Sequence, residues 1–575
     1  MSQATSILVA FCLSVFSTLA LILLRVNTQP LFFIFYLAAV VLLSLLVLVF
    51  KRYQLLSIIV FDLFVFAIFS LQFPLAYQVD RDSGFEAQYA STIVGLGYWD
   101  QTAGVGYAQD YYGYNPALHF SLAFSSLLSG ISVDVLSKWI YIILLRIMFL
   151  LLAFVVLKAV SQNTELSYAA IFVYLITPRL RVIYISRRIV AAIAILACVF
   201  CIAEYLASRK AKFFLMACLL SLLILFCDHT LSILWLFFLF GAFVFYTMRS
   251  ASGKTRSWTI WFLLCLVFGS LFLAYNLYLS PVILQGDLSY LVRIFSFFHT
   301  PGLGSSASVA PIYSSYQMIL MIGSQLLLTF FAFTSFVRNF FKNSINPLLM
   351  YWSFAAFPAI VLLTYLLNTR WVVFANIIIW FFLLPICFFF SVFLKRALKS
   401  SLFFSIGIIL FIFAGNLLLA YHPNVLFSDS NAAFVELPEY KNHDILDSAA
   451  WLANYTEGKP TFIIGDRSVF DIYSAYYGFV VSPEEIAKAF YASNLTRMEH
   501  NFLARPVYFG SYSQTAQTVQ PDFVVVNLDL AANRSYEITL KTDDFKKFEE
   551  TRFLKRIYQN ANIVIYENTL KSAKV

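Results

Sequence analysis

The sequence has few charged residues for its length. Asp, Glu, Lys and Arg make up 12% of the 575 residues, whereas soluble domains usually carry about 25%. Apolar residues account for 61% of the chain, and 63 of them are Phe. This balance excludes a water-soluble globule and predicts a membrane protein.

Cysteine is absent from the last part of the chain. All seven Cys lie in apolar runs, the last of them at Cys387, so residues 421–575 contain no disulfide framework, zinc cluster or cysteine nucleophile. Residues 1–420 carry a formal charge of +13 and residues 421–575 one of −4, which together give the +9 of the chain. A basic membrane part indicates membrane lipids or lipid phosphates as partners and argues against nucleic acid.

Long apolar runs fill residues 1–420. About 20 apolar residues are needed to cross the hydrocarbon core of a bilayer, and we predict about thirteen such helices. The expected spans are 7–24, 31–50, 56–76, 136–157, 166–178, 189–208, 213–228, 231–248, 258–278, 315–337, 347–367, 371–394 and 401–420. The fold class is therefore a polytopic α-helical membrane domain over 1–420, followed by an α/β domain over 421–575.

Basic residues indicate which side of the membrane each loop faces, because short cytoplasmic loops collect Lys and Arg. Alternate loops contain Lys158, Arg209-Lys210 and Lys395-Arg396, with Glu165 as their only acid. This pattern predicts a plasma-membrane protein with a cytoplasmic N-terminus. An odd number of spans then places residues 421–575 outside the cell.

Two long loops, 77–135 and 279–313, are expected on the outer side, where long loops tend to carry function. In the first loop, Phe85, Tyr89, Ile93 and Leu96 recur at helical spacing, which predicts a short interfacial helix. Asn115-Pro116 then precedes an apolar stretch, 117–128, that is too short to span. The second loop is rich in Pro, Gly and Ser, a composition that favours a mobile segment able to close over a site.

Charged residues inside apolar runs are rare, and each is a functional candidate. Asp62, Arg146 and Glu204 lie in the third, fourth and sixth expected spans. We expect Asp62 and Arg146 to form a neutralising pair between adjacent helices, with a structural role.

Several arginines lie at the outer ends of the spans, although most basic residues of the loops are on the cytoplasmic side. Guanidinium groups suit phosphate oxygens, so these side chains are candidates for the headgroup of a lipid ligand; binding of ordinary anionic lipid is the alternative. The candidates are Arg179, Arg181, Arg187, Arg188 and Arg370. Asp228-His229 is expected at a similar depth, as a hydrogen-bonded pair rather than a metal site.

Asp80-Arg81-Asp82 follows the third expected span directly. A carboxylate at this depth meets a lipid-linked substrate and a water-borne acceptor, so it is placed for general-base catalysis. One alternative is that the side-chain oxygens of Asp80 and Asp82 bind a divalent cation. Another is that the triplet is a solvated turn with no function. The neighbouring loop is rich in aromatic residues suited to sugars.

This arrangement resembles the GT-C superfamily of integral-membrane glycosyltransferases, which use polyprenyl-phosphate-linked sugars. Asp80-Arg81-Asp82, Tyr114-Asn115-Pro116 and the basic-capped span that follows carry the resemblance. The general likeness is to protein mannosyltransferases and aminoarabinose transferases. This sequence departs from the usual GT-C pattern, because its acidic loop follows the third span and not the first. Trp451–Tyr455 also differs from the WWDYG motif of oligosaccharyltransferases, which disfavours transfer of a whole oligosaccharide.

The resemblance implies an inverting transfer of a sugar from polyprenyl phosphate to an extracytoplasmic acceptor, in glycosylation of a protein or in assembly of the cell envelope. Asp80 or Asp82 is then the catalytic base, and the outer arginines hold the donor phosphate. Residues expected to contact acceptor or sugar are Glu86, Tyr89, Trp99, Tyr112, Asp228 and His229. The competing functions are a membrane transporter or lipid flippase, and a non-enzymatic subunit of a polysaccharide assembly complex.

Residues 421–575 combine helix and strand signals. Strands are expected at 461–464, 506–509, 523–527 and 562–566, and a capping box at Ser482–Glu485 predicts a helix to about Ala492. Gly465-Asp466 follows one strand, where ligands often bind in open α/β sheets, but no phosphate-binding loop accompanies it. We therefore expect a small α/β sandwich whose Gly465-Asp466 is structural.

Overall fold

The structure is a computed structural model, and part of the chain is described below. The described residues are 54–70, 81–99, 115–177, 187–251, 258–280, 315–342, 345–367, 372–400, 404–405, 407–412, 443–457, 459, 461–465, 469–474, 477–482, 507–509, 517–528 and 543–572. The chain divides into two compact units. The first comprises residues 1–76, 139–274 and 313–430, and the second comprises 77–138, 275–312 and 431–575.

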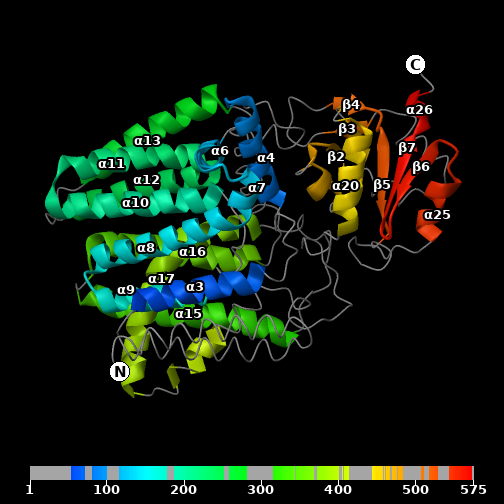
Figure 1. Ribbon diagram of the computed structural model, residues 1–575. Helices are drawn as coiled ribbons and strands as arrows, with labels where there is room; N and C mark the ends of the chain where they lie inside the picture. Colours follow the sequence, from blue (N-terminus) through cyan, green and yellow to red (C-terminus); the bar gives the residue numbers. More distant parts are fainter. Residues whose placement is uncertain are drawn as a thin grey trace, which may run out of the picture. The chain divides into compact units, whose positions relative to one another are not determined.

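The first unit is helical, and its helices follow the apolar runs of the sequence (Figure 1). They are α3 (Gln54–Ser70), α8 (Tyr141–Ser161), α9 (Thr164–Leu175), α10 (Arg187–Ser208), α11 (Ala211–Cys227), α12 (His229–Ala251), α13 (Trp258–Tyr278), α15 (Ser315–Phe341), α16 (Pro347–Leu367) and α17 (Val372–Ser400). Each coincides with an expected span. The expected spans 7–24 and 31–50 lie outside the described residues, and only 404–405 and 407–412 of the span 401–420 are described. The total of about thirteen therefore stays a prediction.

Five helices in the described part of the chain are long and apolar enough to cross a membrane. They are Val133–Ser161, Arg187–Ser208, His229–Ser250, Trp258–Tyr278 and Phe381–Lys399. Large apolar side chains are exposed along α11 and α12, among them Leu215, Leu219, Phe237 and Phe240. Burial in lipid is the physical reason for helices that are apolar on their outer face. The predicted membrane class is therefore confirmed.

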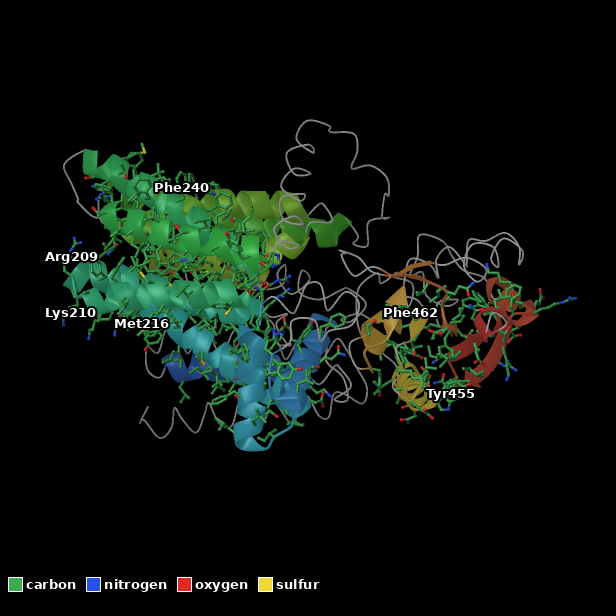
Figure 2. All side chains as sticks on the ribbon, turned by 90° about the horizontal axis from the view of Figure 1, so that it is seen from above. Arg209, Lys210, Met216, Phe240, Tyr455 and Phe462 are labelled. Atoms are coloured by element: carbon green, nitrogen blue, oxygen red, sulfur yellow. The ribbon has the colours of Figure 1, made fainter. Side chains whose placement is uncertain are left out.

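Polar residues end and restart the helices between spans. Helix α8 ends at Gln162, which adopts a left-handed conformation with φ of 55°, and the side chain of Asn163 then accepts the Leu166 N–H at 3.0 Å to cap α9. Arg209, with φ of 58°, likewise separates α10 from α11. Figure 2 shows Arg209 and Lys210 at the turn of this helical hairpin. These tight turns make neighbouring helices antiparallel, so alternate connections lie at the same end of the bundle.

A buried ion pair joins α3 to α8. The Nε of Arg146 donates to Oδ2 of Asp62 at 3.0 Å, and its Nη2 contacts Oδ1. The two residues are 6% and 2% exposed. The predicted neutralising pair is therefore confirmed, because each charge is satisfied by the other where water is excluded.

The second unit begins with short helices from the first long loop. Helix α4 (Arg81–Leu96) and helix α6 (Ala117–Ser129) pack on each other, and α7 (Val133–Val135) follows (Figure 1). A π-helical turn, η1 (Leu136–Ile140), then leads into α8. Helix α4 confirms the helical spacing of Phe85, Tyr89 and Ile93, whose side chains are all buried. Helix α6 confirms that 117–128 is helical and too short to span.

The C-terminal part of the second unit contains a five-stranded sheet. The strands are β1 (Phe462–Ile464), β2 (Val480–Ser482), β5 (Phe523–Asn527), β6 (Leu554–Gln559) and β7 (Ile563–Asn568), in the order β2-β1-β5-β7-β6. The first three strands of this order are parallel, with Ile463 opposite both Val481 and Phe523, and β7 is antiparallel to β5 and β6. Strands β3 (Val507–Phe509) and β4 (Gln517–Val519) form a separate antiparallel pair.

Apolar side chains alternate along β5 and form one core on each face of the sheet. Phe523 and Val525 pack with α20 (His443–Tyr455), whereas Val524 and Val526 pack with α25 (Asp543–Glu550). A further π-helical turn, η4 (Phe470–Ser474), and the short helix α26 (Thr569–Ser572) complete the described elements of this part. The expected strands are present in β1, β3, β5 and β7. Asp466 lies outside the described residues, and so does the helix that was expected after Ser482.

Candidate functional site

Helix α4 carries the acidic end of the predicted catalytic loop. Asp82 is the second residue of α4, and Glu86 follows it by four residues. Positions four apart share a face of an α-helix, so the backbone places Asp82 and Glu86 on the same face, one turn apart. Asp80 lies outside the described residues. The role of Asp80 or Asp82 as a base, and their alternative role as cation ligands, stay predictions.

Glu86 is buried and contacts a histidine on the neighbouring helix. Its Oε2 lies against Nε2 of His119, and the two residues are 1% and 0% exposed. The ring of Tyr89 stacks on the ring of His119, with 5.1 Å between the ring centroids and 17° between the ring planes. A carboxylate oxygen and an imidazole nitrogen in hydrogen-bond contact satisfy each other inside the protein. The pair therefore fixes α4 on α6, at one turn from Asp82.

The start of α6 explains why His119 faces α4. Pro116 occupies the N-cap position of α6, and Asn115 before it is buried. Leu118, His119 and Leu122 then recur at helical spacing on the buried side of α6. His119 was not among the residues predicted from the sequence. The signal that could have identified it is this apolar stripe, since a polar residue among buried apolar ones needs a partner.

Two aromatic residues predicted to bind sugar belong to this loop. The ring of Trp99 contacts the ring of Phe120 edge to face, with 6.1 Å between the ring centroids. Tyr112 lies outside the described residues. The structure thus brings Glu86 and Tyr89 together on α4 and places Trp99 shortly after that helix. Their contacts with sugar or acceptor stay predictions.

An arginine cluster lies in the first unit and is defined here as Arg187, Arg188 and Asp228. The Oδ2 of Asp228 is 3.5 Å from Nε of Arg187 and 3.9 Å from Nε of Arg188. Arg187 is 3% exposed and Asp228 is 1% exposed. The cluster forms because α10 begins at Arg187 and α11 runs back to end at Cys227. Charges in so buried a place interact more strongly than on a surface.

Asp228 also starts the next helix. Its Oδ1 accepts the backbone N–H of Leu231 at 2.8 Å, which caps the first turn of α12. His229 is 5% exposed, and its Nε2 lies 3.1 Å from the hydroxyl of Thr230. The structure thus joins Asp228 to the arginines, a contact that the sequence did not indicate. The predicted roles of Asp228 and His229 in sugar or acceptor binding stay predictions.

The remaining predicted phosphate ligands are not among the residues that the structure describes. These are Arg179, Arg181 and Arg370. Within the described ranges, no group of three or more His, Cys, Asp or Glu side chains is arranged to hold a metal ion.

Comparison with solved structures identifies the fold. A structure of a variant of the arabinofuranosyltransferase AftD from Mycobacteria aligns with a TM-score of 0.50 and 13% identity, over 90% of this chain and 41% of that chain. ArnT from Cupriavidus metallidurans bound to undecaprenyl phosphate aligns with a TM-score of 0.49 and 12% identity, over 89% of this chain and 97% of that one. The chain has a GT-C-like fold. No protein-family model matches the sequence, and neither does any curated protein.

The predicted resemblance to GT-C membrane glycosyltransferases is confirmed at the level of the fold. At 13% identity the likeness to AftD extends to the arrangement of the chain alone, and this chain spans less than half of the AftD chain. One fold supports many activities, so the fold alone does not show the function of this chain.

Proposed function

We propose that this chain is a membrane glycosyltransferase that transfers a sugar from a polyprenyl-phosphate donor to an acceptor outside the membrane. The observation that carries the proposal is the arginine cluster at the start of α10. Arg187 and Arg188 open a helix that is apolar over the next four turns, from Ile189 to Ala203. A helix N-terminus and guanidinium groups both favour a phosphate, and an apolar helix favours a ligand attached to a lipid.

The acidic helix α4 supplies the second part of the proposed reaction. Asp80 or Asp82 takes a proton from the acceptor while the acceptor oxygen or nitrogen forms a bond to the anomeric carbon of the sugar. The bond between that carbon and the phosphate oxygen breaks, which inverts the anomeric centre. The released polyprenyl phosphate gains negative charge, and Arg187 and Arg188 stabilise it, with Arg179, Arg181 and Arg370 as the further proposed ligands.

Residues around α4 are proposed to hold the acceptor and the sugar. Tyr89, Trp99 and Tyr112 supply aromatic rings suited to stacking on sugars. The Glu86–His119 contact holds α4 against α6 and so limits the movement of the Asp82 position. Precise placement of a general base matters because proton transfer requires hydrogen-bond distance.

The positions of basic residues support the proposed orientation in the plasma membrane. Lys158, Arg209, Lys210 and Arg249 all lie at the ends of helices opposite to the end that carries the arginine cluster. Short loops rich in Lys and Arg face the cytoplasm, so we place this end inside the cell. The arginine cluster, loops 77–135 and 279–313, and an α/β domain over 421–575 are then outside.

Native mass spectrometry of the full chain, extracted gently in detergent, tests the proposal without presuming a substrate. We expect a co-purifying polyprenyl phosphate or its glycoside, and we expect Arg187→Ala to lose it. The matched control is Arg209→Ala, which removes an arginine from the opposite end of α10. Bulk phospholipid alone, unchanged in Arg187→Ala, would overturn the phosphate site and favour a transporter or an assembly subunit.

A further inference from the structure

Asp228 holds its two carboxylate oxygens in different environments. Oδ1 accepts the Leu231 N–H and caps α12, whereas Oδ2 lies 3.5 and 3.9 Å from the Nε atoms of Arg187 and Arg188. The carboxylate is 1% exposed, so water screens its charge weakly. One carboxylate therefore lies against both guanidinium groups that the proposed function assigns to the donor phosphate.

In this geometry Asp228 sets the net charge of the arginine cluster, and so the charge that a bound ligand faces. Arg187 and Arg188 carry two positive charges, and Asp228 offsets one of them. We propose that Asp228 is the specificity-determining residue of the arginine cluster. Its negative charge lowers the affinity of the cluster for a lipid diphosphate more than it lowers the affinity for a lipid phosphate of lower charge. The inference rests on the proposed function, since it concerns the same arginines.

The charge of the two ligand classes explains why a carboxylate discriminates between them. A lipid joined to a sugar through one phosphate carries one negative charge, and a free lipid phosphate carries about 1.5 to 2 near neutral pH. A lipid diphosphate carries more than either at the same pH. Each added negative charge on the ligand gains attraction to the arginines but meets repulsion from Asp228. A unit charge within several ångströms changes the affinity for a singly charged ligand by about tenfold or more at the dielectric typical of protein sites.

Asp228→Asn separates the charge of this residue from its capping role. The Asn side chain has a carbonyl oxygen that accepts the Leu231 N–H, and Asn is as good an N-cap as Asp. The variant raises the net charge of the cluster by one and leaves the start of α12 capped. Glu204→Gln is the matched control. It adds the same charge to α10, about 24 Å along the helix from Arg188, which is beyond the range of electrostatic interaction at physiological salt.

The probes are undecaprenyl phosphate and undecaprenyl diphosphate, offered together to the detergent-solubilised full chain with phosphatidylglycerol as competitor. Native mass spectrometry gives the ratio of the two bound lipids. We expect the charge of Asp228 to hold this ratio further toward the monophosphate than it is in a variant without that charge. Asp228→Asn shifts the ratio about tenfold toward the diphosphate, and Glu204→Gln leaves it unchanged.

Arg188→Gln supplies an opposite change that does not depend on the folding of Asp228→Asn. It lowers the charge of the cluster by one, so we expect a shift toward the monophosphate. The double variant Asp228→Asn/Arg188→Gln restores the net charge, and we expect it to return the ratio close to that of the unmodified chain.

Two outcomes would overturn the inference, and they have different meanings. If the chain binds polyprenyl phosphate but neither Asp228→Asn nor Arg188→Gln moves the ratio, Asp228 does not set specificity and the proposed function stands. If neither probe binds above phosphatidylglycerol, the proposed phosphate site fails together with the inference.

Discussion

The buried pair between α3 and α8 gives a prediction whose magnitude follows from the structure. Arg146 donates to both carboxylate oxygens of Asp62, and both residues are nearly inaccessible to solvent. Asp62→Leu leaves the guanidinium buried with its carboxylate partner gone, and Arg146→Leu leaves the carboxylate in the same position. Removal of one partner from a buried pair typically destabilises a protein by about 3–5 kcal/mol.

The double variant Asp62→Leu/Arg146→Leu behaves differently from either single change. It removes both charges and replaces them with apolar side chains, which is often neutral or stabilising for buried pairs. We therefore expect the free energy of unfolding to fall in each single variant and to recover most of that loss in the double variant. Unfolding of the purified chain in detergent, followed by circular dichroism, measures the three changes.

Additive losses would refute this reasoning. If the double variant is as unstable as the sum of the two single variants, Asp62 and Arg146 contribute independently and the pair is not a coupled unit. A control for the change of side-chain shape at position 62 is Asp62→Asn, which keeps the shape of the acid and removes its charge.

Two further predictions concern packing. Gly241→Ala places a methyl group 2.6 Å from the hydroxyl of Tyr351, so we expect a loss of about 1–3 kcal/mol in the free energy of unfolding. Gly269→Ala is the control, because its methyl group lies 3.6 Å from Cδ1 of Leu236, an ordinary contact. Equal stability of the two variants would refute the close contact at Gly241. Glu86→Leu and His119→Leu are each expected to destabilise the α4–α6 contact. Their effects are expected to be non-additive by about 0.5–3 kcal/mol in a double-mutant cycle of thermal unfolding, and simple additivity would contradict the buried pair.

The membrane helices were predictable because their signal is local. A run such as 189–208 is long enough and apolar enough to specify α10 by itself, and its turn to α11 is marked by Arg209-Lys210. The Asp62–Arg146 pair was also predictable, since a charge in an apolar run requires a partner of opposite sign. Strand β5 is similar, because its continuous apolar residues indicate a buried strand.

The site contacts were harder to predict because they join distant positions. His119 reaches Glu86 across 33 residues, and Asp228 reaches Arg187 only after α10 and α11 have folded back on each other. Neither pairing leaves a spacing in the sequence that distinguishes it from other choices. The strands β2, β4 and β6 were also missed. β2 and β4 have three residues each, and β6, with the sequence LKRIYQ, places two basic residues side by side, so none of them shows a clear alternation of apolar and polar residues.

Turnover by aspartate variants tests the central claim most directly. The full chain in proteoliposomes is supplied with a panel of polyprenyl-phosphate monosaccharides, and the release of free polyprenyl phosphate is measured. We predict release by the unmodified chain, and a loss of about 10²–10⁴-fold in Asp80→Asn or Asp82→Asn, with expression and lipid binding retained. Release that is equal in the unmodified chain and in both variants would contradict the assignment of a catalytic base to this loop.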